Sequence, residues 1–421
     1  MFRKLSKLSL LTLTLAMIFV NLRVPVAHAA AAQVTFWGDW TGDGATQIQT
    51  MVDAFNKSQS DIQVNYVPTQ DIVTKFLTAA TSGSAPDLLI WDRFRTALYA
   101  PKGVLMPIDD LMAASKISSA DFYSEALREL TYGGKLYGLP MTVDTRALYY
   151  NKTMLDAAGI KPPTTWDELE QAAIKLTVRK DGKLQVAGVS LQDVGLFNMW
   201  LQQAGGKMVT DDGSKTAFNS PEGLSVLAYW DKLINQDKVY EIGFEQGLGQ
   251  DQDAFVTGKV AMQFNGPWML STYKKYGKDL TFGVVPSPAG PKGNKGGVMG
   301  GFGLAIPTAT THSKEAWAFM TWWLAQPANS VLWAKTSLSI PGNLKAIADP
   351  FFQSDPYLKP FTDALKDAKI RPPFAGYPSM EGDALIPNLQ LFVQGKQSAA
   401  DTLKKAQQDG DQILTDNNIP Q

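Results

Sequence analysis

Hydrophobic and polar positions follow two different periods near the start of the chain. Residues 33–37 alternate polar and apolar side chains, which predicts a strand, and residues 45–56 place apolar side chains at helical spacing. The same order then repeats, with a strand expected at 62–67, a helix at 72–81 and a continuously apolar strand at 87–91. This strand–helix alternation predicts an α/β domain with a parallel sheet.

A second α/β region follows, with a strand expected at 148–151 and a short helix at 153–158 that ends at Gly159. Thr165 and Glu168 have the spacing of a capping box, which predicts that a helix begins at Trp166. Further helices are expected at 221–235, 316–325 and 399–414, and the aromatic rings of the 312–326 segment are expected to pack in a core. Three stretches are predicted to connect the two regions, at 142–145, 283–288 and 336–341.

The first residues have the pattern of a secretory signal peptide. Arg3, Lys4 and Lys7 precede an apolar run at 8–22, and Ala27-His28-Ala29 offers a small-x-small cleavage site. We therefore expect residues 1–29 to be a signal peptide and the rest to lie outside the cytoplasm, in the periplasm or the extracellular space. The chain has no Cys to carry a lipid, so we expect no direct membrane insertion.

Composition excludes several kinds of chemistry. The 421 residues suggest two domains, and two His with no Cys leave few ligands for zinc, so no metal or cofactor is expected. A formal net charge of −1 gives no case for nucleic acid as a partner. Eleven Trp is a high count, and some of these rings are expected to face a ligand.

Several motifs, in order along the chain, carry a resemblance to a known family. They are Lys135-Leu136-Tyr137-Gly138-Leu139-Pro140, Asn151-Lys152, Pro163-Thr164-Thr165-Trp166-Asp167-Glu168-Leu169, Gly258-Lys259-Val260-Ala261-Met262, Gly266-Pro267-Trp268, and Gly300-Gly301 before Leu304-Ala305-Ile306-Pro307. This succession resembles the maltose-binding-protein-like family of bacterial extracellular solute-binding proteins. The resemblance implies a type II-like periplasmic-binding-protein fold, in which two discontinuous lobes are joined by a three-segment hinge.

The resemblance also implies how the chain is divided and what it does. The first lobe would contain residues 30–142 and 286–336, and the second lobe residues 143–285 and 337–421. A carbohydrate would bind between the lobes, and closure around it would be recognised by the permease subunits of an ABC importer. We expect a monomer in solution.

A sugar ring needs flat aromatic platforms for its C–H faces and carboxylates, amides or Arg for its hydroxyl rim. The main candidates are Trp40, Trp91, Asp92, Asp144 and Trp268, with Gly300 and Gly301 allowing close backbone approach. Each has a structural alternative: Trp91 could end a core strand, and Asp144 could make a hinge hydrogen bond. Further candidates are Gln70, Arg93 (which could instead pair with Asp92), Asp193, Trp200, Arg371 and Tyr377.

Other functions remain open at this point. A secreted carbohydrate-active enzyme would also use aromatic and acidic residues, but the chain lacks a Gly-x-Ser-x-Gly elbow, a His-Glu-x-x-His motif and a P-loop. Relatives of the family bind glycerol phosphate esters or polyols, and a phosphate would call for several cationic donors. A surface adhesin is a third alternative, with no repeat array to support it. The number of candidate aromatic platforms favours a di- or oligosaccharide.

Overall fold

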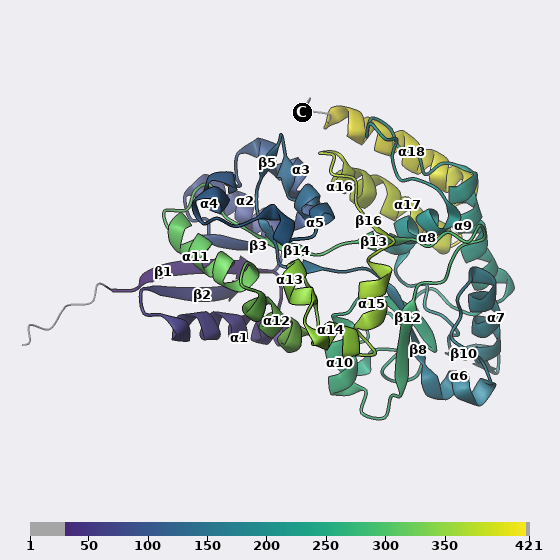
Figure 1. Cartoon of the computed structure of the whole chain (residues 1–421). Coiled ribbons are helices and arrows are strands. Elements are labelled where there is room, and N and C mark those ends of the chain that lie inside the picture. The colour runs from purple at the N-terminus through teal and green to yellow at the C-terminus, as the bar shows by residue number, and fades with distance from the viewer. Residues whose placement is uncertain (1–29, 418–421) are drawn as a thin grey trace, which may run out of the picture.

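Two lobes of mixed helices and strands stand side by side in the computed structural model, which describes residues 30–417 (Figure 1). The expected signal peptide at 1–29 lies outside the described residues. Within residues 30–417, no helix has both the length and the apolar composition needed to cross a membrane. The two-lobed α/β fold expected from the sequence is confirmed.

The first lobe is built on a five-stranded sheet in the order β2-β1-β3-β14-β6. Its first three strands are parallel, as predicted, because each is connected to the next through a helix or a helical loop. β14 comes from much later in the chain and runs antiparallel between β3 and β6. The elements of this lobe are β1(Ala32–Gly38), α1(Gly42–Ser58), β2(Ile62–Pro68), α2(Ile72–Ser82), β3(Leu88–Asp92), α3(Thr96–Tyr99), α4(Asp109–Ala114), α5(Ser124–Glu129), β4(Thr131–Tyr132), β5(Lys135–Leu136), β6(Leu139–Pro140), β14(Phe302–Ala305), α11(Ser313–Leu324) and α12(Pro327–Ser337).

The second lobe contains a three-stranded antiparallel sheet in the order β11-β8-β12, surrounded by helices. Thr165 caps α7 as predicted, since its hydroxyl accepts a hydrogen bond from the Glu168 backbone N–H at 3.2 Å. The elements are β8(Ala147–Asn151), α6(Lys152–Ala158), α7(Trp166–Leu176), β9(Val178–Lys180), β10(Lys183–Val186), α8(Phe197–Ala204), α9(Pro221–Asp231), β11(Met262–Asn265), α10(Met269–Tyr276), β12(Phe282–Pro286), β13(Gly297–Met299), α14(Pro350–Ser354), α15(Lys359–Ala364), β16(Ala368–Ile370), α16(Tyr377–Ser379), α17(Ile386–Val393) and α18(Ala399–Asp416).

Three chain segments cross between the lobes and lie next to one another. The first crossing, β7(Thr142–Val143), pairs antiparallel with the third, β15(Ile340–Pro341), which continues into α13(Leu344–Ile347). The second crossing is at Gly300, which exchanges backbone hydrogen bonds of 3.1 and 2.9 Å with Asp144. Pairing of all three crossings makes a narrow ribbon between the lobes, on which they can rotate relative to each other.

The second crossing is not where the sequence placed it. The stretch 283–288, expected to be a connection, contains most of β12 and belongs to the sheet of the second lobe. Gly283 suggested a flexible linker, but a Cβ there would lie 2.2 Å from the Tyr150 ring of the neighbouring strand, so the glycine serves strand packing. Residues 286–299 therefore lie with the second lobe and not, as expected, with the first.

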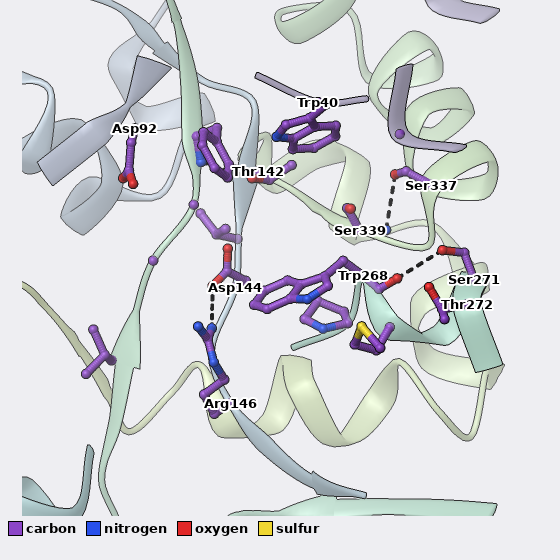
Figure 2. A pocket seen from close by; sticks show the side chains of 18 of the residues that line it. Trp40, Asp92, Thr142, Asp144, Arg146, Trp268, Ser271, Thr272, Ser337 and Ser339 are labelled. Atoms are coloured by element: carbon purple, nitrogen blue, oxygen red, sulfur yellow. Dashed lines mark hydrogen bonds and ion pairs between the residues drawn. The ribbon is translucent and has the colours of Figure 1, made fainter. Parts of the chain in front are cut away.

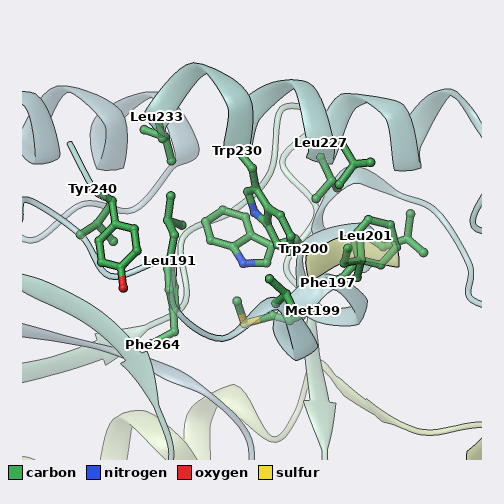
Figure 3. Close-up of a cluster of buried hydrophobic side chains, with 14 of the residues drawn as sticks. Leu191, Phe197, Met199, Trp200, Leu201, Leu227, Trp230, Leu233, Tyr240 and Phe264 are labelled. Carbon is green, nitrogen blue, oxygen red and sulfur yellow. The ribbon is translucent and has the colours of Figure 1, made fainter. Parts of the chain in front are cut away.

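Each lobe has its own hydrophobic core. In the first lobe, the α11 rings Trp317, Phe319 and Trp323 are buried, which confirms that this aromatic cluster is packing. The second lobe has a core around Trp200 and Trp230 (Figure 3). A third cluster lies at the crossings, where Val143 and Ile340 join second-lobe residues to Ala126 and Ala334 of the first lobe. The two main cores are separate and only the third cluster spans the crossings, so the lobes can rotate about this region as rigid bodies.

Candidate ligand-binding site

A cavity of about 620 Å³ lies between the lobes, against the crossing segments. This volume is within the range of about 300–1,000 Å³ found for small-molecule sites. Both lobes and all three crossings contribute to its wall (Figure 2). Of the residues predicted to bind, those that line it are Trp40, Asp92, Asp144, Asp193, Trp268, Gly300, Gly301 and Arg371.

Trp40 is an aromatic wall fixed to the core of the first lobe. Its ring stacks on the buried Trp333 ring, with centroids 5.6 Å apart and an interplanar angle of 28°, and meets Phe302 edge-on at 5.5 Å. Its backbone carbonyl accepts a hydrogen bond of 2.9 Å from the Tyr66 hydroxyl. These contacts hold the Trp40 ring and backbone in position in the absence of a ligand.

Trp268 is the aromatic wall of the second lobe and is 38 % exposed, unusually open for so large an apolar side chain. It directly precedes α10, and its ring folds back over Gly266, where a Cβ would come within 2.0 Å of the ring. The Arg146 guanidinium lies 4.5 Å from the ring centroid. Figure 2 shows the rings of Trp40 and Trp268 entering the cavity from different lobes.

Asp92 is the last residue of β3 and its partly exposed carboxylate faces the cavity. Among residues 30–417, the structure shows no hydrogen bond to this carboxylate. Burial raises its pKa to about 6, although the Arg371, Arg95 and Arg93 guanidiniums lower it in part. An unpartnered carboxylate at this depth is ready to accept hydrogen bonds from a ligand.

Asp144 and Arg146 form an ion pair on the first crossing, with 3.4 Å between Arg146 Nη1 and Asp144 Oδ1. Burial lowers the pKa of Arg146, an effect that the neighbouring Asp144 carboxylate opposes. Arg146 was not predicted from the sequence, and it joins Asp144 to the Trp268 ring. Arg146 therefore contacts both the charged and the aromatic parts of the second-lobe wall.

Gly300 and Gly301 line the cavity, and because they have no side chain they also leave room for the neighbouring crossing segment. A Cβ on Gly301 would lie 2.4 Å from the Thr142 carbonyl oxygen, and its φ of +125° disfavours any other residue. A Cβ on Gly300 would lie 3.0 Å from the Asp144 carboxylate. The glycines allow the first and second crossings to pack directly against each other.

Arg371 enters from the second lobe and contacts the first. Its Nε donates a hydrogen bond of 2.9 Å to the buried Glu381 carboxylate, and its guanidinium lies 4.8 Å from the centroid of the Phe94 ring. Asp193 lines the same cavity with an exposed side chain, and it accepts a hydrogen bond of 2.9 Å from the Gly195 N–H. Arg371 therefore bridges the two lobes near Asp92.

Two predicted tryptophans are corrected by the structure. Trp91 is 1 % exposed and packs against Phe76 and Tyr99 in the first lobe. Successive residues of a strand face opposite sides, so the orientation that brings Asp92 to the cavity turns Trp91 into the core. Trp200 is also 1 % exposed, within the second-lobe core shown in Figure 3.

Three polar candidates also lie away from the cavity. Arg93 does not pair with Asp92: it is fully buried, pairs with Glu129 at 3.0 Å, and donates hydrogen bonds to the Thr142 and Gly300 carbonyl oxygens. Tyr377 is buried and donates a hydrogen bond of 3.3 Å to Glu381. Gln70 is exposed in the turn before α2 and does not line the cavity.

The sequence analysis missed a group of hydroxyl-bearing residues at one end of the cavity. Two belong to the start of α10, directly after the predicted Trp268, and two lie within the predicted connection 336–341, at the end of α12 and just after it. The Ser337 hydroxyl caps the backbone turn by accepting a hydrogen bond of 3.2 Å from the Ser339 N–H. The residues of this group are Ser271, Thr272, Ser337 and Ser339.

Figure 2 shows these hydroxyl-bearing residues at one end of the cavity and Asp92, Asp144 and Arg146 toward the other, with the Trp268 ring between them. Within residues 30–417, no group of three or more His, Cys, Asp or Glu side chains is placed to hold a metal ion.

Comparison with known proteins gives a consistent family. Residues 50–360 match the model of the bacterial extracellular solute-binding protein family. A maltotriose-binding protein from Pyrococcus abyssi is 25 % identical over 351 residues, which cover 82 % of this chain and 74 % of that protein.

Two solved structures superimpose over nearly their whole length. CpMnBP1 with mannobiose bound is 27 % identical, with a TM-score of 0.81 over 90 % of this chain and 99 % of that one. The GacH receptor of Streptomyces glaucescens GLA.O, solved unliganded and with acarbose, is 25 % identical, with a TM-score of 0.81 over 92 % of this chain and 100 % of that one. With the family model spanning most of both lobes, this chain belongs to the bacterial extracellular solute-binding proteins.

Proposed function

We propose that this protein captures a neutral di- or oligosaccharide between its lobes and delivers it to the permease subunits of an ABC importer, without reacting with it. The observation that carries the proposal is the pair of tryptophans, Trp40 and Trp268, presented by opposite lobes to one cavity. Each can stack on the C–H face of a sugar ring. A ligand that contacts both would favour the closed arrangement of the lobes, because only that arrangement makes both contacts.

The polar groups of the cavity suit the hydroxyl rim of a sugar. Asp92 can accept hydrogen bonds from ligand hydroxyls, and charge-assisted bonds of this kind are the strong ones. Arg371 keeps its terminal nitrogens available, because the Glu381 carboxylate binds its Nε. The relatives named above that bind maltotriose, mannobiose and acarbose support a carbohydrate for this chain.

A role in hydrolysis would need two carboxylates acting as acid and base or nucleophile. A pKa of about 6 would suit Asp92 as an acid, but its nearest acidic neighbour in the cavity, Asp144, is paired with Arg146. The family relationship also supports binding. We therefore propose capture without catalysis, which predicts that oligosaccharides are recovered intact after prolonged incubation with the protein.

A phosphate ester is the second candidate ligand, because Arg146 and Arg371 both enter the cavity. Each guanidinium already pairs with a carboxylate, Asp144 or Glu381, and the unpartnered Asp92 would repel an anion. These charges favour a neutral ligand. Export with removal of residues 1–29, and a monomeric state, are parts of the same proposal; mass spectrometry of the secreted protein and light scattering test them.

The experiment is a thermal-shift screen of the purified protein against mono- and oligosaccharides, polyols and glycerol phosphate esters. A ligand at about 100 times its Kd adds about 2.7 kcal/mol to the free energy of unfolding. A molecule of this size then melts a few degrees higher, at about 2–4 °C per kcal/mol or less. If phosphate esters raised the melting temperature and no neutral sugar or polyol did, the neutral-sugar proposal would be overturned.

Substitution of Trp268 tests the site itself. Trp268→Ala removes the exposed ring, and we expect it to weaken sugar binding at least about 10-fold, since an aromatic side chain at a binding centre commonly contributes 2 kcal/mol or more. Trp268→Phe keeps a flat ring and should retain most of the affinity. Equal binding by wild type and Trp268→Ala in calorimetry would contradict the proposed site.

A further inference from the structure

An ion pair joins the two lobes beside the cavity. Asp43 lies in the first turn of α1, in the first lobe, and Lys275 in the last turn of α10, in the second. Lys275 Nζ is 2.7 Å from both carboxylate oxygens of Asp43, and the Tyr276 hydroxyl is 3.5 Å from Asp43 Oδ2. The pair therefore joins the lobes through two residues that belong to none of the crossings.

The position of the pair relative to the cavity follows from helix geometry. Gln47 and Ser271 line the cavity, and each is four residues from a member of the pair, Asp43 and Lys275 respectively. Residues four apart share a helix face and are separated by about one turn, or about 6 Å along the axis. Asp43 itself still lines the cavity, whereas Lys275 does not. The pair thus stands at the rim, where the cavity ends.

Because Lys275 follows Ser271 and Thr272 on α10, this rim is at the hydroxyl-lined end of the cavity. Figure 2 shows Asp92 at the opposite end. At the Asp92 end, Arg371 already reaches the first lobe through the Phe94 ring. A linear ligand that fills the cavity would therefore meet an interlobe contact at either end. The side chains of Asp43 and Lys275 are 44 % and 52 % exposed, so the pair is accessible to solvent and to salt.

We propose that the Asp43–Lys275 pair, here named the clasp, closes one end of the cavity when the lobes are together and so sets the longest sugar chain that the protein holds. A longer chain can bind only by breaking the clasp or by leaving the lobes partly open. The inference rests on the proposed function, since it assigns a length limit to the same ligand. It makes Asp43 and Lys275 specificity-determining residues.

The clasp is tested on the ligand-free protein first. The chain has no cysteine, so spin labels attach only at introduced sites, such as the exposed Ser60→Cys in the first lobe and Lys183→Cys in the second. Electron–electron distance measurements should show longer interlobe distances in Lys275→Ala, and in wild type at high salt, because exposed ion pairs are screened. Unchanged distances in both would overturn the proposal.

Chain length is tested next, by calorimetry with maltose to maltohexaose and with mannobiose to mannohexaose. We expect wild type to bind chains above a certain length more weakly, and Lys275→Ala and Asp43→Asn to reduce that discrimination by about two- to five-fold, the range typical of one exposed pair. In a double-mutant cycle the combined variant should behave like either single one, since both remove the same contact.

Lys274→Ala is the matched control. Lys274 is the preceding residue on the same helix and is similarly exposed, but it pairs with Asp355 of its own lobe at 3.8 Å. Its removal should change neither the interlobe distances nor the length preference. A wild-type length profile in Lys275→Ala, or an equal change in Lys274→Ala, would overturn the proposal. A third outcome is that Lys275→Ala lengthens the interlobe distances but the protein binds no sugar. This result would overturn the proposed function and the length limit, and it would leave the contact between the lobes established.

Discussion

At the scale of single residues, we expect Asp92 to have opposite effects on stability and on the proposed sugar binding. An aspartate in an unfolded chain has a pKa of about 3.9, and burial raises the pKa of Asp92 to about 6. Between these two pH values the folded state binds more protons than the unfolded state, so stability falls as the pH rises. Above a pH of about 6, Asp92 is charged in both states, and its partly buried carboxylate lowers the stability of the folded protein.

We therefore expect Asp92→Asn to raise the free energy of unfolding of the ligand-free protein at about pH 7.5. A gain of about 1–2 kcal/mol is expected after allowance for the partial exposure of the side chain, and no gain at about pH 4. The same variant should bind sugar more weakly at neutral pH, because a neutral amide is a poorer acceptor than a carboxylate.

Urea unfolding at both pH values, with calorimetry at neutral pH, checks this pair of expectations. Asp193→Asn is a suitable control, since it removes an exposed carboxylate from the same cavity and its amide oxygen can still cap Gly195. If Asp92→Asn were less stable than wild type at neutral pH, the cost assigned to its charge would be wrong.

How far a binding residue could be predicted depended on what surrounds it. Trp40 and Trp268 lie in glycine-containing loops that follow strands, where one side of a large ring can stay open, and both reach the cavity. Trp91 and Trp200 belong to regular elements that are buried on more than one side, and only the packing of the whole lobe decides which way such a ring faces. No local pattern marks Arg146 as a cavity residue, because the Trp268 ring that it contacts lies on another segment.

At the scale of elements, Gly301 is a sharp test of how the crossings pack. Gly301→Ala adds a methyl group 2.4 Å from the Thr142 carbonyl oxygen at a backbone φ of +125°. We expect a loss of about 2–5 kcal/mol in the free energy of unfolding, from backbone strain and crowding together.

Gly395→Ala separates these two causes. Gly395 has a φ of +71°, but a Cβ there would meet nothing within 4 Å, so only the backbone strain of about 1–2 kcal/mol applies. Both variants can be compared by urea unfolding. An equal loss in the two would show that the crossings have room to adjust.

Most strands and helices were predictable because their period is local. The parallel strands β1, β2 and β3 and the capped helix α7 agree with the sequence patterns that predicted them. The second crossing was misplaced because glycine and proline mark a tight strand edge as readily as a linker. Gly283 lies beneath the Tyr150 ring of another strand, a contact that the order of residues alone does not show.

At the scale of the whole molecule, the first lobe is completed by a strand that follows most of the second lobe in the sequence. β14 lies between β3 and β6, and α11 and α12 supply Trp323 and Trp333 to the same core. We expect residues 30–141 alone to lack cooperative thermal unfolding. The same residues joined by a glycine-rich linker to 302–337 should regain it, because the sheet and core are then complete.

Circular dichroism melting of the two fragments checks this expectation. A linked fragment with the α11 core residues Phe319 and Trp323 both changed to Ala serves as the control, since it has the missing strand but not the packing. Cooperative melting of residues 30–141 on their own would show that β14 is dispensable to the lobe.

Because β14 is synthesised long after β3, the sheet of the first lobe can be completed only late in translation. Ile90 of β3 pairs with Leu304 of β14, about 200 residues further along the chain. At about 5–20 residues per second, the ribosome needs about 10–40 s to travel from one strand to the other. During that interval the first-lobe sheet has an open edge where its fourth strand belongs, so we expect the lobe to reach its native state only after β14 has been synthesised. Strand order thereby delays the maturation of the first lobe until about three quarters of the chain has been made.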